Sequence, residues 1–104
     1  MKLLNKEYNM IERHVTFTVF PEKSNQFEMF FIDQYRPAMS KMAGFVDVFL
    51  IQEMEHPDLY QMKICFESAE ASEEWRASEV HNVLSLIQKT FYNSSTVVIY
   101  KRIA

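Results

Sequence analysis

Trp75 and His81 are the residues of this sequence whose types and spacing are best suited to chemistry. Trp75 is the only tryptophan of the chain, and His81 follows six residues later in the segment 68–84. An imidazole titrates near neutral pH and can take a proton from a substrate, while an indole can form the wall of an aromatic pocket. The alternatives are a histidine that is exposed or hydrogen-bonded for packing and a tryptophan of the core.

The segment 68–84 must bend if these two side chains are to meet. On one straight helix, six residues at about 100° each would leave them about 120° apart. Ser78 is followed by a carboxylate residue and by a new apolar stripe, which is typical of a helix N-cap. We therefore predict two short helices, the first capped by Ser68 or Ser72 and the second by Ser78, that turn Trp75 and His81 toward one cavity.

Residues 9–20 alternate between apolar and polar side chains and predict a β-strand. Arg13 falls on the same strand face as Val15 and Phe17. If that face looks toward the helices, a buried arginine requires an anionic partner or a ligand oxyanion; otherwise its guanidinium extends to the rim. Asn9 falls on the same strand face and is a weaker candidate for the site. Arg13 is therefore a candidate catalytic residue, and Asn9 and Phe17 are candidate substrate-binding residues.

A helix with an aromatic stripe is predicted next. Ser24 or Asn25 can cap it, and Pro37 either ends it near Tyr35 or kinks it and lets it continue to about Met42. The apolar positions recur at intervals of three and four residues: Phe27, Phe30, Phe31, Ile32, Tyr35 and Met39. Such a stripe is typical of ordinary core, and Phe31, Tyr35 and Met39 are the candidates in it for substrate binding.

The remaining segments complete a β-α-β-β-α-β order. Gly44, the only glycine, suits a turn of positive φ after the helix. Strands are predicted at 45–51 and 59–67, around a turn at 55–58, and a last strand at 96–100 follows a loop at 93–95. This order is typical of an α+β, ferredoxin-like fold, an antiparallel four-stranded sheet with helices on one face.

The second face of this sheet is expected to be covered by another copy of the chain. The strand 45–51 carries apolar side chains in both directions, and Val98 and Tyr100 oppose Val97 and Ile99 in the last strand. A sheet that is apolar on both faces requires cover on both, and the chain has no spare element. We therefore expect a homodimer. The alternative is that these side chains are exposed singly, which is normal.

Composition limits the function classes. The chain has 104 residues, a single-domain length, for which we expect an extension at 1–8 and one domain at 9–104. The net charge of −3 without a basic cluster disfavours nucleic acid as a partner. No apolar run is long enough for a membrane span, and the apolar part of the N-terminus is too short for a signal peptide. The single Cys65 excludes an internal disulfide, so we expect a cytoplasmic protein, and we interpret Cys65 as structural.

Metal and nucleotide sites are not expected. The histidines and acidic residues show no recognised metal-ligand spacing, and one glycine cannot form a phosphate-binding loop. His14 falls on the strand face opposite Arg13, and His56 lies in a turn, so neither is a candidate for the site. No metal and no resident cofactor are therefore predicted.

The sequence resembles the antibiotic biosynthesis monooxygenase (ABM) domain family of dimeric α+β barrels. The resemblance covers roughly residues 10–102 and is carried by Met42-Ala43-Gly44-Phe45, His56-Pro57-Asp58-Leu59-Tyr60, Phe66-Glu67-Ser68 and Trp75-x-x-Ser78-x-x-His81. It implies a homodimer with a pocket in each subunit between helices and sheet. It also implies oxidation of small aromatic phenols or quinols without metal or flavin, whereas other members bind and degrade haem and many have no settled activity.

The haem-degrading branch of that family resembles this chain less well. Its members pair a strand-one asparagine with a helix tryptophan and an iron-binding histidine ten residues beyond. Here Ser85 stands ten residues after Trp75, and Glu12 or Arg13 takes the strand-one position. Cofactor-free oxygenation is therefore the leading hypothesis, and the alternatives are a small-molecule-binding or sensor module without chemistry and a haem-binding protein.

Oxygenation without a cofactor sets its own requirements. A phenol or enol gives an electron to O₂ far more readily once it is deprotonated. The site therefore needs a base, a group that steadies an oxyanion, and a dry aromatic pocket. His81 is the predicted base, with Trp75 as a pocket wall and Arg13 near the oxyanion.

Overall fold

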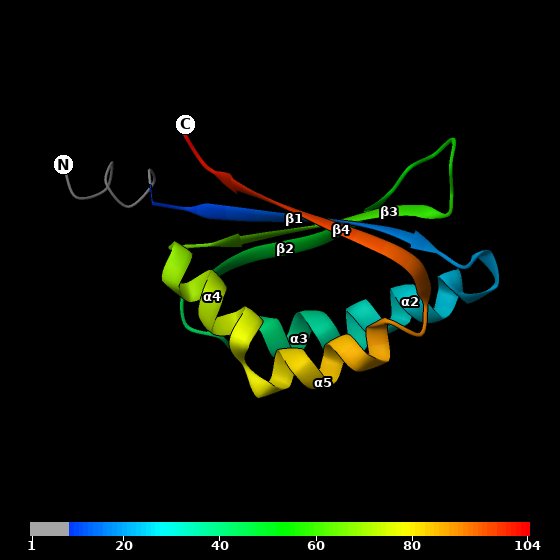
Figure 1. Ribbon diagram of the computed structural model, residues 1–104, viewed down its shortest axis with the longest axis horizontal. Helices are drawn as coiled ribbons and strands as arrows, with labels where there is room; N and C mark the ends of the chain where they lie inside the picture. Colours follow the sequence, from blue (N-terminus) through cyan, green and yellow to red (C-terminus); the bar gives the residue numbers. More distant parts are fainter. Residues whose placement is uncertain (1–8) are drawn as a thin grey trace.

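The computed structural model describes residues 9–104 and shows a β-α-β-β-α-β chain (Figure 1). The expected extension 1–8 lies outside the described residues. The strands are β1 (Ile11–Val19), β2 (Phe45–Gln52), β3 (Leu59–Phe66) and β4 (Tyr92–Lys101). The helical elements are η1 (Pro21–Lys23), α2 (Ser24–Phe30), η2 (Phe31–Tyr35), α3 (Arg36–Met39), α4 (Ala69–Ala77) and α5 (Glu79–Gln88).

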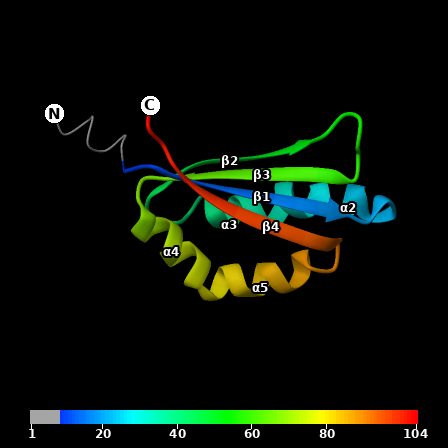
Figure 2. The same ribbon diagram turned by 45° about the horizontal axis from the view of Figure 1, so that its top comes forward.

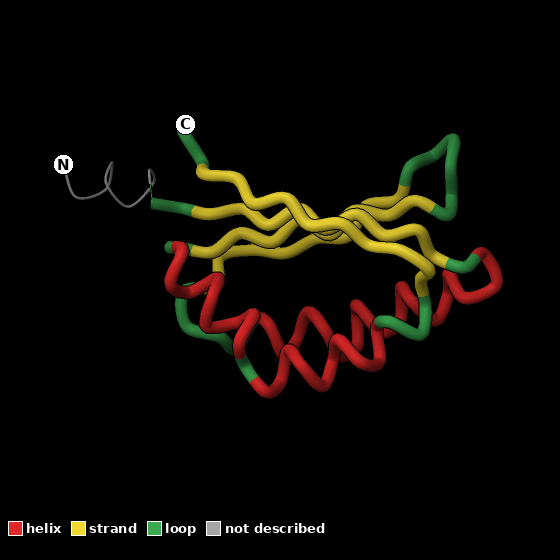
Figure 3. Tube along the Cα trace, viewed as in Figure 1, coloured by secondary structure: helices red, strands yellow, loops and turns green. Residues whose placement is uncertain are grey.

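The four strands form one antiparallel sheet with the order β2-β3-β1-β4. All the helices lie on one side of it, as Figures 2 and 3 show. The α+β, ferredoxin-like fold expected from the sequence is therefore confirmed. Within the described part of the chain, no helix is long and apolar enough to cross a membrane.

The core lies between the helices and the inner face of the two central strands. Val15, Phe17 and Val19 of β1 are buried, and the burial of β3 follows the same two-residue period up to Ile64, after which Cys65 and Phe66 are both buried. Tyr60, Met62, Ile64 and Phe66 point inward, as their alternation with polar residues predicts. Strand β1, at the centre of the sheet, thus holds its odd-numbered residues against the helices.

The first helical segment runs from Ser24 to Met39 and changes geometry in the middle. η2 is a π-helical turn, in which the N–H of Arg36 donates to the carbonyl of Phe31, five residues earlier. Pro37 then falls in the first turn of α3, where a missing N–H costs least. The helix therefore continues past Tyr35 and ends at Met39. Ile32 departs from the predicted stripe because its side chain is 44% exposed.

Gly44 has the predicted positive φ, at 82°. A Cβ at this position would lie 2.5 Å from the Cβ of Ala71 in α4. The carbonyl of Gly44 also accepts a hydrogen bond from the N–H of Glu67 at 2.8 Å. The glycine therefore serves both the turn into β2 and the close approach of α4.

Strand β4 begins earlier than predicted. Residues 93–95, expected as a loop, belong to the strand, with Ser94 opposite Thr18 and Ser95 opposite Phe17. The register shifts between Thr18 and Val19. Pairing with the central strand β1 thus outweighs the turn preference of the Asn-Ser-Ser run, because β propensity depends on context.

The outer face of the sheet mixes apolar and polar side chains. Four large apolar residues on it are between 44% and 49% exposed in the single chain: Phe49, Ile51, Val98 and Tyr100. They are interspersed with Thr16, Gln61 and Lys63. The outer face therefore carries the apolar side chains inferred from the strand patterns, and it also carries several polar ones.

Candidate functional site

Ser78 separates α4 from α5 and bends the chain there, as predicted. Its backbone is extended, with φ −71° and ψ 151°, and its hydroxyl accepts the N–H of His81 at 3.1 Å. The same hydroxyl donates to the carbonyl of Trp75 at 2.8 Å. One serine thus ends the first helix and begins the second. The cap of α4 is Ser68, whose hydroxyl accepts the N–H of Ala71.

The bend brings the Trp75 and His81 rings into contact. Their centroids lie 5.3 Å apart at an interplanar angle of 73°. Trp75 is 1% exposed. Trp75 Nε1 and His81 Nδ1 are both buried and have no hydrogen-bond partner among residues 9–104. Because buried polar atoms are normally paired, these two nitrogens are the feature of the core that most resembles an incomplete binding site.

Tyr35 forms a third side of this cluster. Its ring meets the indole edge-on, with centroids 5.7 Å apart at 84°. Burial raises the pKa of Tyr35 to about 12, and the nearby indole of Trp75 opposes that shift only in part. Trp75 Nε1 does not form a hydrogen bond of regular geometry with it. Tyr35 therefore stays protonated at neutral pH and offers a hydroxyl rather than a phenolate.

Arg13 contributes a positive charge from β1. It is partly buried on the face that carries Val15 and Phe17, so it points toward the helices. Burial lowers the pKa of its guanidinium, and Tyr35 and Glu73 oppose that shift. Among the described residues its guanidinium has no ion pair within salt-bridge distance. Of the two alternatives that the sequence left open, the structure shows Arg13 partly buried on the helix side of the sheet, and its catalytic role stays a prediction.

The pKa of His81 is lowered, first by burial and second by the charge of Arg13. The backbone of Arg76 and the side chain of Asn82 act in the opposite direction. His81 is therefore a neutral imidazole at pH 7, which is the protonation state of a general base. The arrangement can accept a proton at a buried, largely apolar site beside a fixed cation.

The other predicted site residues are distributed differently. Phe17 contacts Phe27 and Tyr92 within the aromatic core, and Met39 is completely buried. Phe31 stacks on Tyr35, with centroids 6.4 Å apart. Asn9 is exposed and lines a separate pocket beside the start of α4. The structure thus brings together Arg13, Tyr35, Trp75 and His81, with Phe31 as a neighbour, and places Asn9 elsewhere.

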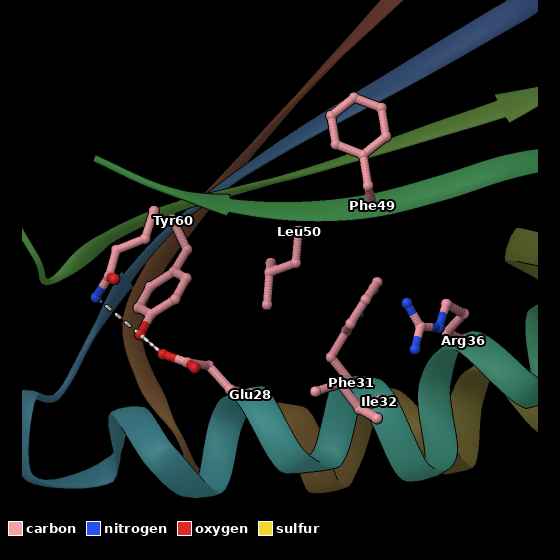
Figure 4. Close-up of a pocket in the computed structure, with 8 residues that line it drawn as sticks. Glu28, Phe31, Ile32, Arg36, Phe49, Leu50 and Tyr60 are labelled. Carbon is pink, nitrogen blue, oxygen red and sulfur yellow. Dashed lines mark hydrogen bonds between the residues drawn. The ribbon is translucent and has the colours of Figure 1, made fainter. Parts of the chain in front are cut away.

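A pocket that the sequence did not indicate lies between the first helical segment and β2 (Figure 4). Its volume is about 280 Å³, and its lining residues are Glu28, Phe31, Ile32, Arg36, Phe49, Leu50, Gln52 and Tyr60. The four-residue spacing of Glu28, Ile32 and Arg36 could have indicated one shared helix face. Their position opposite Tyr60 depends on how the helix docks on the sheet.

The described residues include no cluster of three or more histidine, cysteine or acidic side chains that could hold a metal ion.

Comparison with solved structures shows the same fold in other proteins. A conserved protein from Methanosarcina mazei is 17% identical, with a TM-score of 0.85 over 95% of this chain and 98% of that chain. SnoaB, a cofactor-independent oxygenase from Streptomyces nogalater, is 16% identical, with a TM-score of 0.83 over 92% and 95% of the two chains. At these identities the likeness concerns the fold. No curated protein matches the sequence significantly.

The family is shown by the sequence itself. The sequence model of the antibiotic biosynthesis monooxygenase family matches residues 10–83, which is more than half of the chain and includes the bend, Trp75 and His81. The resemblance inferred from short motifs is therefore confirmed, and the chain belongs to the antibiotic biosynthesis monooxygenase family.

Proposed function

We propose that the protein is a cofactor-independent monooxygenase that acts on a small aromatic substrate, of the quinol, phenol or anthrone type, at the Trp75–His81 cluster. Family membership and the fold shared with a cofactor-independent oxygenase support the reaction class. The observation that carries the proposal is the pair of buried, unpartnered nitrogens, Trp75 Nε1 and His81 Nδ1. A polar substrate atom would give these nitrogens the partner that they lack.

The chemistry follows from the charges of the cluster. Neutral His81 takes a proton from the substrate, and Arg13 stabilises the resulting oxyanion. The anion transfers one electron to O₂, and the two radicals combine to a peroxide at the former C–H carbon. Loss of water then leaves a carbonyl, so that R₂CH₂ and O₂ give R₂C=O and H₂O. The substrate supplies all four electrons, and no other reductant is needed.

Oxygen uptake with a panel of quinols and anthrones tests this proposal. We expect turnover by the wild-type protein and a loss of about 100-fold or more in His81→Ala, the usual contribution of a general base. His56→Ala is the matched control, because His56 lies exposed in the β2–β3 turn. Equal rates in wild type and His81→Ala would remove His81 as the base.

The same panel addresses the alternatives. Saturable binding of the aromatic compounds without oxygen uptake would favour a binding or sensor module. A haemin titration followed by absorbance tests the proposed absence of a cofactor. We expect a spectrum no different from that of free haemin, whereas a shifted Soret band that is lost in His81→Ala would favour haem binding.

We also propose that two copies assemble through the outer face of the sheet. Phe49, Ile51, Val98 and Tyr100 remain half exposed there in the single chain. Burial of such side chains against the same face of a second copy removes apolar area from water and satisfies two-fold symmetry.

A further inference from the structure

The pocket beside β2 contains two charged side chains that lie at opposite ends of an apolar floor. Figure 4 shows Glu28 and Tyr60 together at one end and Arg36 at the other, with Phe31, Ile32 and Leu50 between them. Its volume of about 280 Å³ lies near the lower limit for small-molecule sites and suits a molecule with a single ring.

The acidic end is held in place by a chain of hydrogen bonds. The Tyr60 hydroxyl donates to Glu28 Oε2 and accepts from Gln52 Nε2 at 3.0 Å. Gln52 Nε2 also donates to the carbonyl of Pro57 at 2.8 Å. Burial, followed by the Glu28 carboxylate, raises the pKa of Tyr60 to about 12, so this hydroxyl remains a donor. One oxygen of Glu28 is thus engaged, and the other is left to accept from a ligand.

The basic end is formed by Arg36. Its guanidinium lies 5.5 Å from the centroid of the Phe31 ring and is exposed. Neither Glu28 nor Arg36 has an ion-pair partner among the described residues. They are eight residues apart along a helical segment that includes the π-helical turn η2, and both side chains line the pocket. A benzene ring with para substituents offers one polar group to each end of the pocket.

We propose that this pocket is a second binding site, for a single-ring aromatic molecule that carries a hydrogen-bond donor opposite an anionic group, as in 4-hydroxybenzoate. The donor binds Glu28, the anion binds Arg36, and the ring lies on Phe31 and Leu50. The proposal goes beyond the oxygenase activity, because Tyr35 and the buried part of Phe31 separate this pocket from the indole of Trp75.

Calorimetric titration with 4-hydroxybenzoate, benzoate and phenol tests the two ends separately. We expect 4-hydroxybenzoate to bind wild type roughly tenfold more tightly than either compound that lacks one group, since each charge-assisted hydrogen bond contributes about that factor. Glu28→Gln should weaken 4-hydroxybenzoate roughly tenfold and leave benzoate unchanged. Arg36→Gln should weaken 4-hydroxybenzoate and benzoate and leave phenol unchanged.

The same experiment includes controls for the fold of the variants and for the position of the bound ligand. Glu28→Gln keeps an oxygen for the Tyr60 hydroxyl, Arg36 is exposed, and both variants should keep the wild-type circular dichroism spectrum. Glu22→Gln and Lys41→Gln change exposed charges outside the pocket and should bind like wild type. In nuclear magnetic resonance spectra, 4-hydroxybenzoate should show nuclear Overhauser contacts to Leu50.

Three results would overturn the proposal: no saturable binding of 4-hydroxybenzoate, unchanged affinity in both pocket variants, or ligand contacts to the indole of Trp75 instead of Leu50. Oxygen uptake by wild type and His81→Ala is measured independently of these three results, so failure of this site is distinguishable from failure of the proposed oxygenase activity.

Discussion

The hydroxyl of Ser78 donates to the carbonyl of Trp75 at 2.8 Å while it accepts the N–H of His81 at 3.1 Å. One side chain therefore fixes both the end of the helix that carries the indole and the start of the helix that carries the imidazole. The contact between the two rings depends on this serine because a continuous helix would direct them to different sides.

Replacement of Ser78 should loosen the site as well as the fold. Ser78→Ala removes the N-cap of α5 and the bond to Trp75, and we expect a loss of about 1–2 kcal/mol in the free energy of unfolding by urea. Ser68→Ala removes only the cap of α4 and should cost about 1 kcal/mol. The fluorescence of Trp75, the only tryptophan, should shift in Ser78→Ala and not in Ser68→Ala. If the two variants gave the same spectrum, the contact between the two rings would not depend on Ser78.

His81 should make stability depend on pH in a defined window. Its pKa in the folded state lies below the ordinary histidine value of about 6.5, so the unfolded chain binds more protons between the two values. Stability should therefore fall as the pH decreases below about 6.5 and be level above it. His81→Gln should flatten this decline, whereas His56→Gln should not.

Below about pH 4.5, the pH dependence of stability should come from Glu12 instead of His81. The pKa of Glu12 is lowered, first by its hydrogen bond to His14 and then by Arg102, so its contribution is lost as the pH falls below 4.5. A thermal unfolding series between pH 5 and 7 avoids this second transition. An unchanged slope in His81→Gln over that range would contradict the assignment to His81.

Gly44 and Ala71 should show energetic coupling. Gly44→Ala places a side chain at positive φ and 2.5 Å from the Cβ of Ala71, and we expect a loss of about 3 kcal/mol from strain and overpacking together. Ala71→Gly alone should cost about 1 kcal/mol through lower helix propensity. In the double variant the steric part disappears and the backbone strain remains, so the loss should be smaller than the sum. Additive losses in a chemical denaturation cycle would show that α4 moves away instead.

The proposed dimer makes a prediction on the outer face of the sheet. Val98→Lys introduces a charge there and should shift the mass measured by light scattering from dimer to monomer. Val83→Lys is the control, because Val83 in α5 is similarly exposed, 53% against 49%, but lies on the helical layer. A wild-type protein that remains monomeric at micromolar to millimolar concentrations would contradict the dimer.

Local patterns were sufficient for much of the architecture. The alternation in β1 and β3, the aromatic stripe of the first helix, Gly44 and the Ser78 cap are all set by neighbouring residues in the chain. Each depends on periodicity, φ or a capping bond, which act over a few residues. For this reason the sequence alone predicted the fold class and the family, and it also predicted the bend at Ser78 between Trp75 and His81.

Only the tertiary structure decided how distant elements meet. Residues 93–95 became strand because β1 offered ladder partners, and Ile32 became exposed because the helix docks with Phe31 and Tyr35 inward. Arg13 and Tyr35 joined the Trp75–His81 cluster, while Asn9 did not. The pocket of Glu28, Arg36 and Tyr60 likewise exists only once the helix lies across the sheet. Such contacts depend on docking and packing between segments far apart in sequence, which no local pattern encodes.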